Sequence, residues 1–202
     1  MYTSCNWKRA LMKHLVLGLC CALLTIDCHS DQKSDTEADV SAAKAAIMEL
    51  ATALQSELKA AMQTGGPVAA IGVCNTQAMP ITQKVAMERG LHLSRVSLNN
   101  RNPANLPNEW QAVVLKDFQQ KQTEGKDIGS LAWSETVDVD GEQEFRFMKA
   151  IPTAAVCLAC HGTALSPQVS QVLADLYPKD RATGYQAGDI RGAFVATRKL
   201  SD

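Results

Sequence analysis

The stretch AWSETVDVDGEQEFRFMKAI, residues 132–151, decides the fold class of this chain. Apolar and polar residues alternate on both sides of Asp140-Gly141, and this pattern predicts two antiparallel strands joined by a tight turn. The second predicted strand leads directly into VCLACHG, residues 156–162, where two cysteines and a histidine fall close together. The predicted hairpin thus adjoins the segment with the most distinctive chemistry.

Helical patterns precede and follow the hairpin. Apolar residues recur at steps of three and four over residues 35–63, which predicts a long amphipathic helix that Gly65-Gly66 ends. The other expected helices cover residues 67–80, 81–89, 109–126 and 166–178, and the other expected strands cover residues 91–98 and 190–200. Helices first and then an antiparallel sheet with helices packed on it make an α+β fold.

The composition is that of one globular domain. The 202 residues are 46% hydrophobic and 20% charged, which provides enough apolar material for a substantial core. The formal net charge is −1, and no cluster of basic residues is visible. Nucleic-acid binding usually requires a clustered basic surface, so we expect no nucleic acid among the partners.

Residues 1–30 have the order of features found in export signals. Three basic residues, Lys8, Arg9 and Lys13, precede an apolar run over residues 15–26. This run is shorter than the roughly 20 residues that span a bilayer, and a polar stretch follows it. A buried N-terminal helix is the structural alternative, but the pattern favours export to the periplasm.

Cleavage after Ser30 would leave a polar linker at residues 31–39 and one domain at residues 40–202. An uncleaved membrane anchor stays open as an alternative. Lipidation of Cys28 is disfavoured, because Asp27 stands where a lipoprotein signal has a small residue. The mature chain would keep three cysteines, which cannot all pair with one another in an oxidising compartment. At least one of them must have another role.

Cys157, Cys160 and His161 form a C-x-x-C-H motif, the attachment signature of c-type haem. Two thiols separated by two residues on a turn of helix add to the porphyrin vinyl groups, and the adjacent imidazole becomes an axial ligand of the iron. The sequence therefore predicts one covalently attached haem c.

Three other interpretations of this motif are a thioredoxin-like dithiol, half of a zinc site, and a structural disulfide between Cys157 and Cys160. A zinc site would need Cys74 and His92 as its remaining ligands. A redox dithiol usually lies at the start of a thioredoxin βαβ unit, and the sequence shows no such pattern.

The second axial ligand of the iron has several candidates. His92 alternates with leucines on an expected strand and should face the surface. Cys74 is either the second ligand or a buried free thiol. Met48 and Met62 fall on the apolar stripe of the long helix and are expected in the core. The methionines that could offer a thioether ligand are Met48, Met62, Met79, Met87 and Met148.

Four segments, AIGVCNTQA, SRVSLNNRNPANLPNEWQ, CLACHG and YPKDRATGYQAGDIRGAF, carry a family resemblance that extends over residues 40–197. In them the chain resembles a family of bacterial exported c-type haem proteins and sensor domains with a PAS-like fold. The resemblance implies a long N-terminal helix against a central antiparallel sheet that carries a haem pocket. It also implies His161 and Cys74 as the two axial ligands, because in that family a cysteine before the first strand ligates the iron.

Arginines are expected to bind the haem propionates, since guanidinium groups pair well with carboxylates. Arg95 and Arg101 are the leading candidates, and the alternative for Arg101 is to tie a turn-rich loop together. Tyr185, Asp189 and Arg191 are weaker candidates, because the glycines around them indicate a turn before a strand.

Three functional classes remain. The first is a redox or gas sensor that signals through an unidentified protein partner, since PAS-like pockets often hold signalling cofactors. The alternative is a small periplasmic electron-transfer cytochrome. An enzyme acting on peroxide or nitrogen oxides is disfavoured, because only His92 is available as a distal acid–base group. The long helix is also a candidate surface for a homodimer, although such a stripe is usually core.

Overall fold

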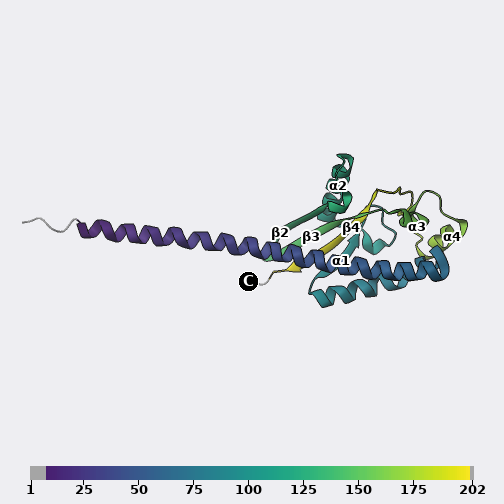
Figure 1. Cartoon of the computed structure of the whole chain (residues 1–202), viewed down its shortest axis with the longest axis horizontal. Helices are drawn as coiled ribbons and strands as arrows, with labels where there is room; N and C mark the ends of the chain where they lie inside the picture. Colours follow the sequence, from purple (N-terminus) through teal and green to yellow (C-terminus); the bar gives the residue numbers. More distant parts are fainter. Residues whose placement is uncertain (1–7, 201–202) are drawn as a thin grey trace, which may run out of the picture. The chain divides into compact units, whose positions relative to one another are not determined.

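The computed structural model describes the backbone of residues 8–200 and the side chains of residues 36–200 (Figure 1). The chain divides into two units, Met1–Asp39 and Val40–Asp202. Within the described residues, no helix combines the length and the hydrophobicity that a bilayer span requires. The predicted signal segment at residues 1–30 lies outside the described side chains, so its role in export stays a prediction.

Helix α1 (Lys8–Arg89) is interrupted at Gly66. Gly66 has a φ of 67° and a ψ of −161°, a backbone conformation that essentially only glycine adopts. The chain reverses there, and residues 40–65 pack antiparallel to the arm that follows (Figure 1). Nε of Arg89 donates a hydrogen bond to the carboxylate of Glu49 across this pair, at 2.7 Å. We call the helical part before Gly66 the first arm of α1 and the part after it the second arm. The predicted end of the first arm at Gly65-Gly66 is confirmed.

Pro80 does not end the helix, contrary to the prediction of two separate helices on either side of it. A proline removes one backbone hydrogen bond and crowds the preceding turn. The helix nevertheless continues to Arg89, because it buries Ala78 and Val85 on either side of the proline. The hydroxyl of Thr82 also donates to the Ala78 carbonyl, at 2.7 Å. Tertiary packing therefore outweighs the local cost of the proline.

Four antiparallel strands form one sheet in the order β1-β4-β3-β2. The strands are β1 (His92–Val96), β2 (Ala132–Val139), β3 (Glu142–Pro152) and β4 (Ile190–Lys199). The predicted hairpin is confirmed as β2 and β3, with Val139 opposite Glu142. Asp140 and Gly141 turn the chain with φ values of 57° and 85°, as a tight hairpin turn of this kind requires.

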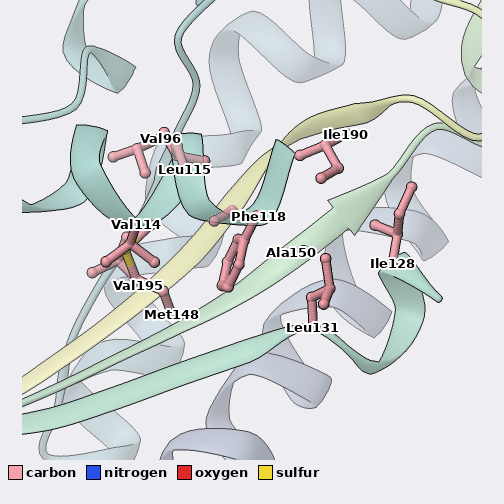
Figure 2. Packing of buried hydrophobic residues seen from close by; sticks show 11 residues of the cluster. Val96, Val114, Leu115, Phe118, Ile128, Leu131, Met148, Ala150, Ile190 and Val195 are labelled. Atoms are coloured by element: carbon pink, nitrogen blue, oxygen red, sulfur yellow. The ribbon is translucent and has the colours of Figure 1, made fainter. Parts of the chain in front are cut away.

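Helix α2 (Glu109–Thr123) covers one face of the sheet. Its Leu115 and Phe118 are buried against Met148 of β3 and Val195 of β4, and Figure 2 shows these side chains between the helix and the strands. Phe118 has no exposed surface. This layer is a closed apolar core.

Helix α1 covers the opposite face. Because neighbouring residues of a strand point to opposite faces, Phe145 and Phe147 of β3 face away from α2. They pack with Ile47 and Leu50 of the first arm of α1 and with Val85 of the second. The sheet is therefore enclosed between two helical layers within residues 40–200.

Shorter helices complete the fold. They are η1 (Pro103–Asn105), η2 (Ile128–Ser130), η3 (Ala155–Cys157), α3 (Leu158–His161) and α4 (Pro167–Leu176). The side chain of Asn108 accepts a hydrogen bond from the backbone N–H of Gln111 at the start of α2, and Ser166 accepts one from Val169 at the start of α4. The predicted α+β class is confirmed.

The prediction that Met48 lies in the core is wrong. Its side chain is 70% exposed, because it follows the buried Ile47 and each step along a helix turns the side chain by about 100°. Met79 and Met87 are also exposed, and Met148 is fully buried in the layer under α2. These three methionines lie at the surface or in the α2 core.

Replacement of Phe118 by Ala should lower the free energy of unfolding by about 3–5 kcal/mol, because a fully buried aromatic ring is lost from a packed core. Urea unfolding followed by circular dichroism measures this loss. Val113→Ala on the same helix, where the side chain is 67% exposed, is the control and should change the stability by less than about 0.5 kcal/mol. Equal losses in both variants would contradict the assigned core.

Candidate functional site

The C-x-x-C-H motif follows the end of β3. The backbone of Thr153 pairs with a later segment, since its N–H donates to the Asp189 carbonyl and its carbonyl accepts from the N–H of Gly188, both at 2.8 Å. The chain then winds through η3 and α3, which bring Cys157 and Cys160 onto consecutive turns. Both thiols are free and only partly exposed. The sequence predicts this arrangement, with the two thiols separated by two residues on a turn of helix.

His161 ends α3, and its ring is held by one hydrogen bond. Nδ1 lies 2.7 Å from the backbone oxygen of Ala182. Because a carbonyl oxygen only accepts, Nδ1 carries the proton and the lone pair of Nε2 is left free. Burial, together with the positive charges of Arg191 and Arg101, lowers the pKa of His161 to about 3. The imidazole is therefore neutral at physiological pH, the form that ligates a metal.

Asp180 holds the segment that positions His161. One carboxylate oxygen accepts from Nε of Arg101 at 2.9 Å, and the other accepts from the backbone N–H of Ala182 at 2.7 Å. Nη2 of Arg101 also donates to the carbonyl of Cys160 at 2.5 Å and to that of Ala182 at 3.2 Å. Only 13% of the Arg101 side chain and 10% of the Asp180 side chain are exposed. The pair ties the loop before α2 to the cysteine motif.

Further backbone bonds attach the same segment to the motif. The N–H of Gly184 donates to Gly162 and that of Tyr185 donates to His161, at 3.0 and 2.9 Å. The ring of Tyr185 meets the ring of His161 edge to face, with centroids 6.3 Å apart. Tyr185 is thus part of the support of the histidine. The structure places Asp189, the other weak candidate, in the turn that binds Thr153.

Cys74 occupies the second arm of α1, on its buried side. Ala70, Ile71 and Ala78 lie on the same side of the helix at steps of three and four, and all three are buried. Ile71, one turn before Cys74, packs in a cluster that Cys160 borders. Cys74 itself is exposed. The face of α1 that carries Cys74 therefore packs toward the cysteine motif through Ile71, and the Cys74 side chain itself stays accessible.

The surroundings of Cys74 are dense and positively charged. Desolvation by neighbouring atoms raises the pKa of the Cys74 thiol, and the charges of Arg95, Arg191 and Arg101 oppose this rise. The thiol is thus accessible to solvent although many protein atoms surround it. We call the side chains gathered here the Cys74 cluster, and they are Cys74, Arg95, Arg101, Cys157, Cys160, His161, Tyr177 and Arg191.

The structure therefore brings together all six residues that the sequence singles out for the haem site. The thiols interact, since Cys74 and Cys157 contribute to the raised pKa of Cys160, behind burial as the main cause. Arg101 is the one member whose guanidinium is engaged in an ion pair, and it also lies 5.9 Å from the ring centre of Tyr177. Arg101 therefore ties the turn-rich loop together, which was the structural alternative for this residue. Its contact with a propionate stays a prediction.

Other sequence candidates lie elsewhere. His92 is exposed at the start of β1, opposite Thr197. The described residues contain no group of three or more His, Cys, Asp and Glu side chains placed to bind a metal ion, so the zinc arrangement with Cys74 and His92 is not formed. Cys157 and Cys160 are not joined in a disulfide.

A small cavity beside the site has no member of the Cys74 cluster in its wall. Its volume is about 40 Å³, and it is lined by Ser97, Leu98, Asn99, Leu115, Gln119, Tyr185, Ile190 and Gly192. This volume suits water and is far too small for a porphyrin.

Three important groups could not be assigned from the sequence. Asp180 and the backbone carbonyl of Ala182 belong to a loop whose partners are distant in the sequence. Arg191 was only a weaker candidate for a propionate, because the glycines around it indicated a turn before a strand. The one signal for Asp180 is its acidic side chain within YPKDRATGY, where it stands between two basic residues, Lys179 and Arg181.

Replacement of Asp180 by Asn should destabilise the protein by about 3–5 kcal/mol, because it leaves the charge of Arg101 buried without its partner. Urea unfolding of the full chain measures this. The control is Asp175→Asn, since Asp175 is exposed on α4 and bonds only Gln171. Adding Arg101→Gln to Asp180→Asn should cost less than the sum of the single losses. Additive losses would show that the two side chains are not coupled.

Comparisons with known proteins agree with this architecture. No curated protein matches the chain. Among solved structures, the chain is similar to the crystal structure of the cyanobacterial haem protein Tll0287, with a TM-score of 0.61 and 22% sequence identity. The match covers 81% of this chain and 96% of that one, and at this identity it shows the fold. The model of the Tll0287-like family matches residues 27–197. The chain therefore belongs to the Tll0287-like family.

Proposed function

We propose that this protein is an exported haem c protein that carries a single haem attached through Cys157 and Cys160. The observation that carries the proposal is the fixed state of His161, whose protonated Nδ1 binds the Ala182 carbonyl and leaves Nε2 free. Ligand histidines are generally oriented in this way by a partner on the other ring nitrogen. Two free thiols at the attachment spacing precede it. The similarity to a structure described as a cyanobacterial haem protein supports the same proposal.

Cys74 is the proposed second axial ligand of the iron. It is the one described cysteine outside the C-x-x-C-H motif, and it interacts with Cys160 across the Cys74 cluster. Burial raises the pKa of its thiol, and three guanidinium groups oppose this rise and so favour the thiolate, which is the form that ligates a metal. Met148 is buried in the other layer and His92 is exposed at the start of β1, so neither has a comparable position.

Haem at this site would supply an iron that changes its oxidation state and can exchange a ligand. The Cys74 cluster contains no free carboxylate and no second histidine that could act as a general acid or base. This composition favours a protein that responds to a change in the iron over an enzyme that converts a substrate. We therefore propose redox or gas sensing through a protein partner in the periplasm. A small periplasmic electron-transfer cytochrome is the second candidate, because one haem in a domain of this size is sufficient for that role.

Replacement of Cys157 and Cys160 by Ser should abolish covalent haem attachment when the protein is exported in a host with haem-attachment machinery, because the thioether bonds need both thiols. Acid–acetone extraction and mass spectrometry of the chain measure this. The matched control is Cys74→Ser, which should keep the haem attached. Extraction of the haem from the wild-type protein would contradict the attachment.

Replacement of Cys74 by Met should raise the reduction potential on the order of 100 mV or more, because a thiolate stabilises ferric iron and axial ligands set haem potentials over a range of about 0.8 V. Cys74→Ser should give a weakly ligated or high-spin ferric iron. Redox titration combined with electron spin resonance measures both. A sensor should also bind carbon monoxide when reduced, because the anionic sulfur is held less strongly by ferrous iron.

The outcome separates the two functions. An unchanged low-spin spectrum and potential in both variants would show that Cys74 is not a ligand and would favour the electron carrier. A reduced wild-type protein that does not respond to carbon monoxide would favour the carrier as well, since ligand loss adds reorganisation to each electron transfer.

A further inference from the structure

The strand β4 is irregular at its first residues, which lie next to the Cys74 cluster. In the pairing of β3 with β4, Ile151 lies opposite Gly192 but the next residue, Pro152, lies opposite Ile190. Arg191 is therefore an extra residue without a partner on β3, which is the definition of a β-bulge. Bulges change the direction of a side chain relative to the regular alternation, and they are common beside functional sites.

The bulge turns Arg191 toward the Cys74 cluster. Ala193 and Val195 face the core under α2, so strict alternation would also put Arg191 on that side. Ile190 occupies the α2 core instead, and its neighbour Arg191 accordingly points to the opposite face. On β1, Val96 faces the α2 core and Arg95 faces away from it. Arg95 and Arg191 thus meet on the side of the sheet where α1 carries Cys74.

Gly192 makes this bulge possible through close packing. A Cβ atom at this position would collide with the carbonyl oxygen of Val96 on β1 and would lie 3.2 Å from the Cβ of Ser97. The hydroxyl of Ser97 donates to the carbonyl of Arg191 at 2.7 Å, which holds the bulged residue from its other side. The position of Arg191 is therefore fixed by its backbone.

The two guanidinium groups lack acidic partners. Over residues 36–200, neither Arg95 nor Arg191 forms an ion pair or a side-chain hydrogen bond with a carboxylate, whereas Arg101 nearby is bound to Asp180. Burial is the main cause that lowers the pKa of both groups; the charge of Arg191 further lowers the pKa of Arg95, and the charge of Arg101 further lowers that of Arg191. Two partly buried like charges are unfavourable unless an anion lies between them.

We propose that Arg191, together with Arg95, binds the propionate carboxylates of the haem, and that the β4 bulge exists to place this second arginine. This inference rests on the proposed haem site. The two propionates are the carboxylates that such a haem adds to the protein, and guanidinium groups bind carboxylates with matching geometry. The sequence pattern ranked Arg191 below Arg95 and Arg101 for this role, because its glycine neighbours indicated a turn. Arg101, already committed to Asp180, is then a structural residue.

The test is Arg191→Gln in the exported holoprotein, with Arg146→Gln as the matched control. Arg146 is also a partly buried strand arginine, but it stacks over Trp110 on the α2 side, 4.9 Å from the ring centre. Reduction potentials measured from pH 5 to 9 and reduced-minus-oxidised infrared difference spectra report on the carboxylates. Loss of Arg191 should raise the pKa of a propionate, so that it takes up a proton when the iron is reduced.

The expected result for Arg191→Gln is an additional fall of the potential with rising pH, accompanied by a protonated-carboxyl band in the infrared difference spectrum. Wild type and Arg146→Gln should lack both features. Arg191→Lys should suppress them, because the positive charge is kept. Arg95→Gln should reproduce them, since it removes the other half of the pair.

Two outcomes would overturn the inference. Identical pH profiles in Arg191→Gln and Arg146→Gln would show that Arg191 binds no propionate. A high-spin ferric signal in Arg191→Gln without a new carboxyl band would show that the arginine serves the Cys74 thiolate instead. A wild-type protein that carries no covalent haem would refute the proposed function itself, and this is seen before any variant is compared.

Discussion

The buried ion pair between Arg101 and Asp180 joins three parts of the chain that are far apart in sequence. Arg101 follows β1, Asp180 follows α4, and the carbonyl of Cys160 between them accepts from the same guanidinium. Asp180 also orients Ala182, whose carbonyl sets the tautomer of His161. A buried charge pair is stable only when its remaining hydrogen-bonding capacity is used, and here those extra bonds go to the backbone that forms the site.

The two faces of the sheet differ in chemistry. The side under α2 is a closed apolar layer, with Phe118 and Met148 fully buried. The side under α1 is apolar where the first arm packs, and it changes to a positively charged cluster where the second arm presents Cys74. A rigid layer behind the sheet allows the strands to hold Arg95 and Arg191 in place despite their mutual repulsion. The proposed function depends on this asymmetry, because uncompensated positive charge beside an iron site favours anionic ligands.

Much of the secondary structure follows from local patterns. The β2–β3 hairpin was predictable because alternation and the Asp140-Gly141 turn act over a few residues. Gly66 likewise ends its helical arm for a local reason, the backbone conformation that it adopts. The errors have tertiary causes. The helix runs through Pro80 because its flanks are buried, and Met48 is exposed because the sheet contacts the neighbouring face of the helix.

By itself, the sequence determined which reactive groups the site contains. The C-x-x-C-H spacing, the additional cysteine at position 74, and Arg95 and Arg101 can all be identified without the structure. Only the tertiary structure decided how these groups are used. It bound Arg101 to Asp180, fixed the proton of His161 on Nδ1, and turned Arg191 toward Cys74 through a bulge. Such outcomes depend on contacts between segments up to about a hundred residues apart and on a one-residue shift in strand register, and no local pattern encodes either.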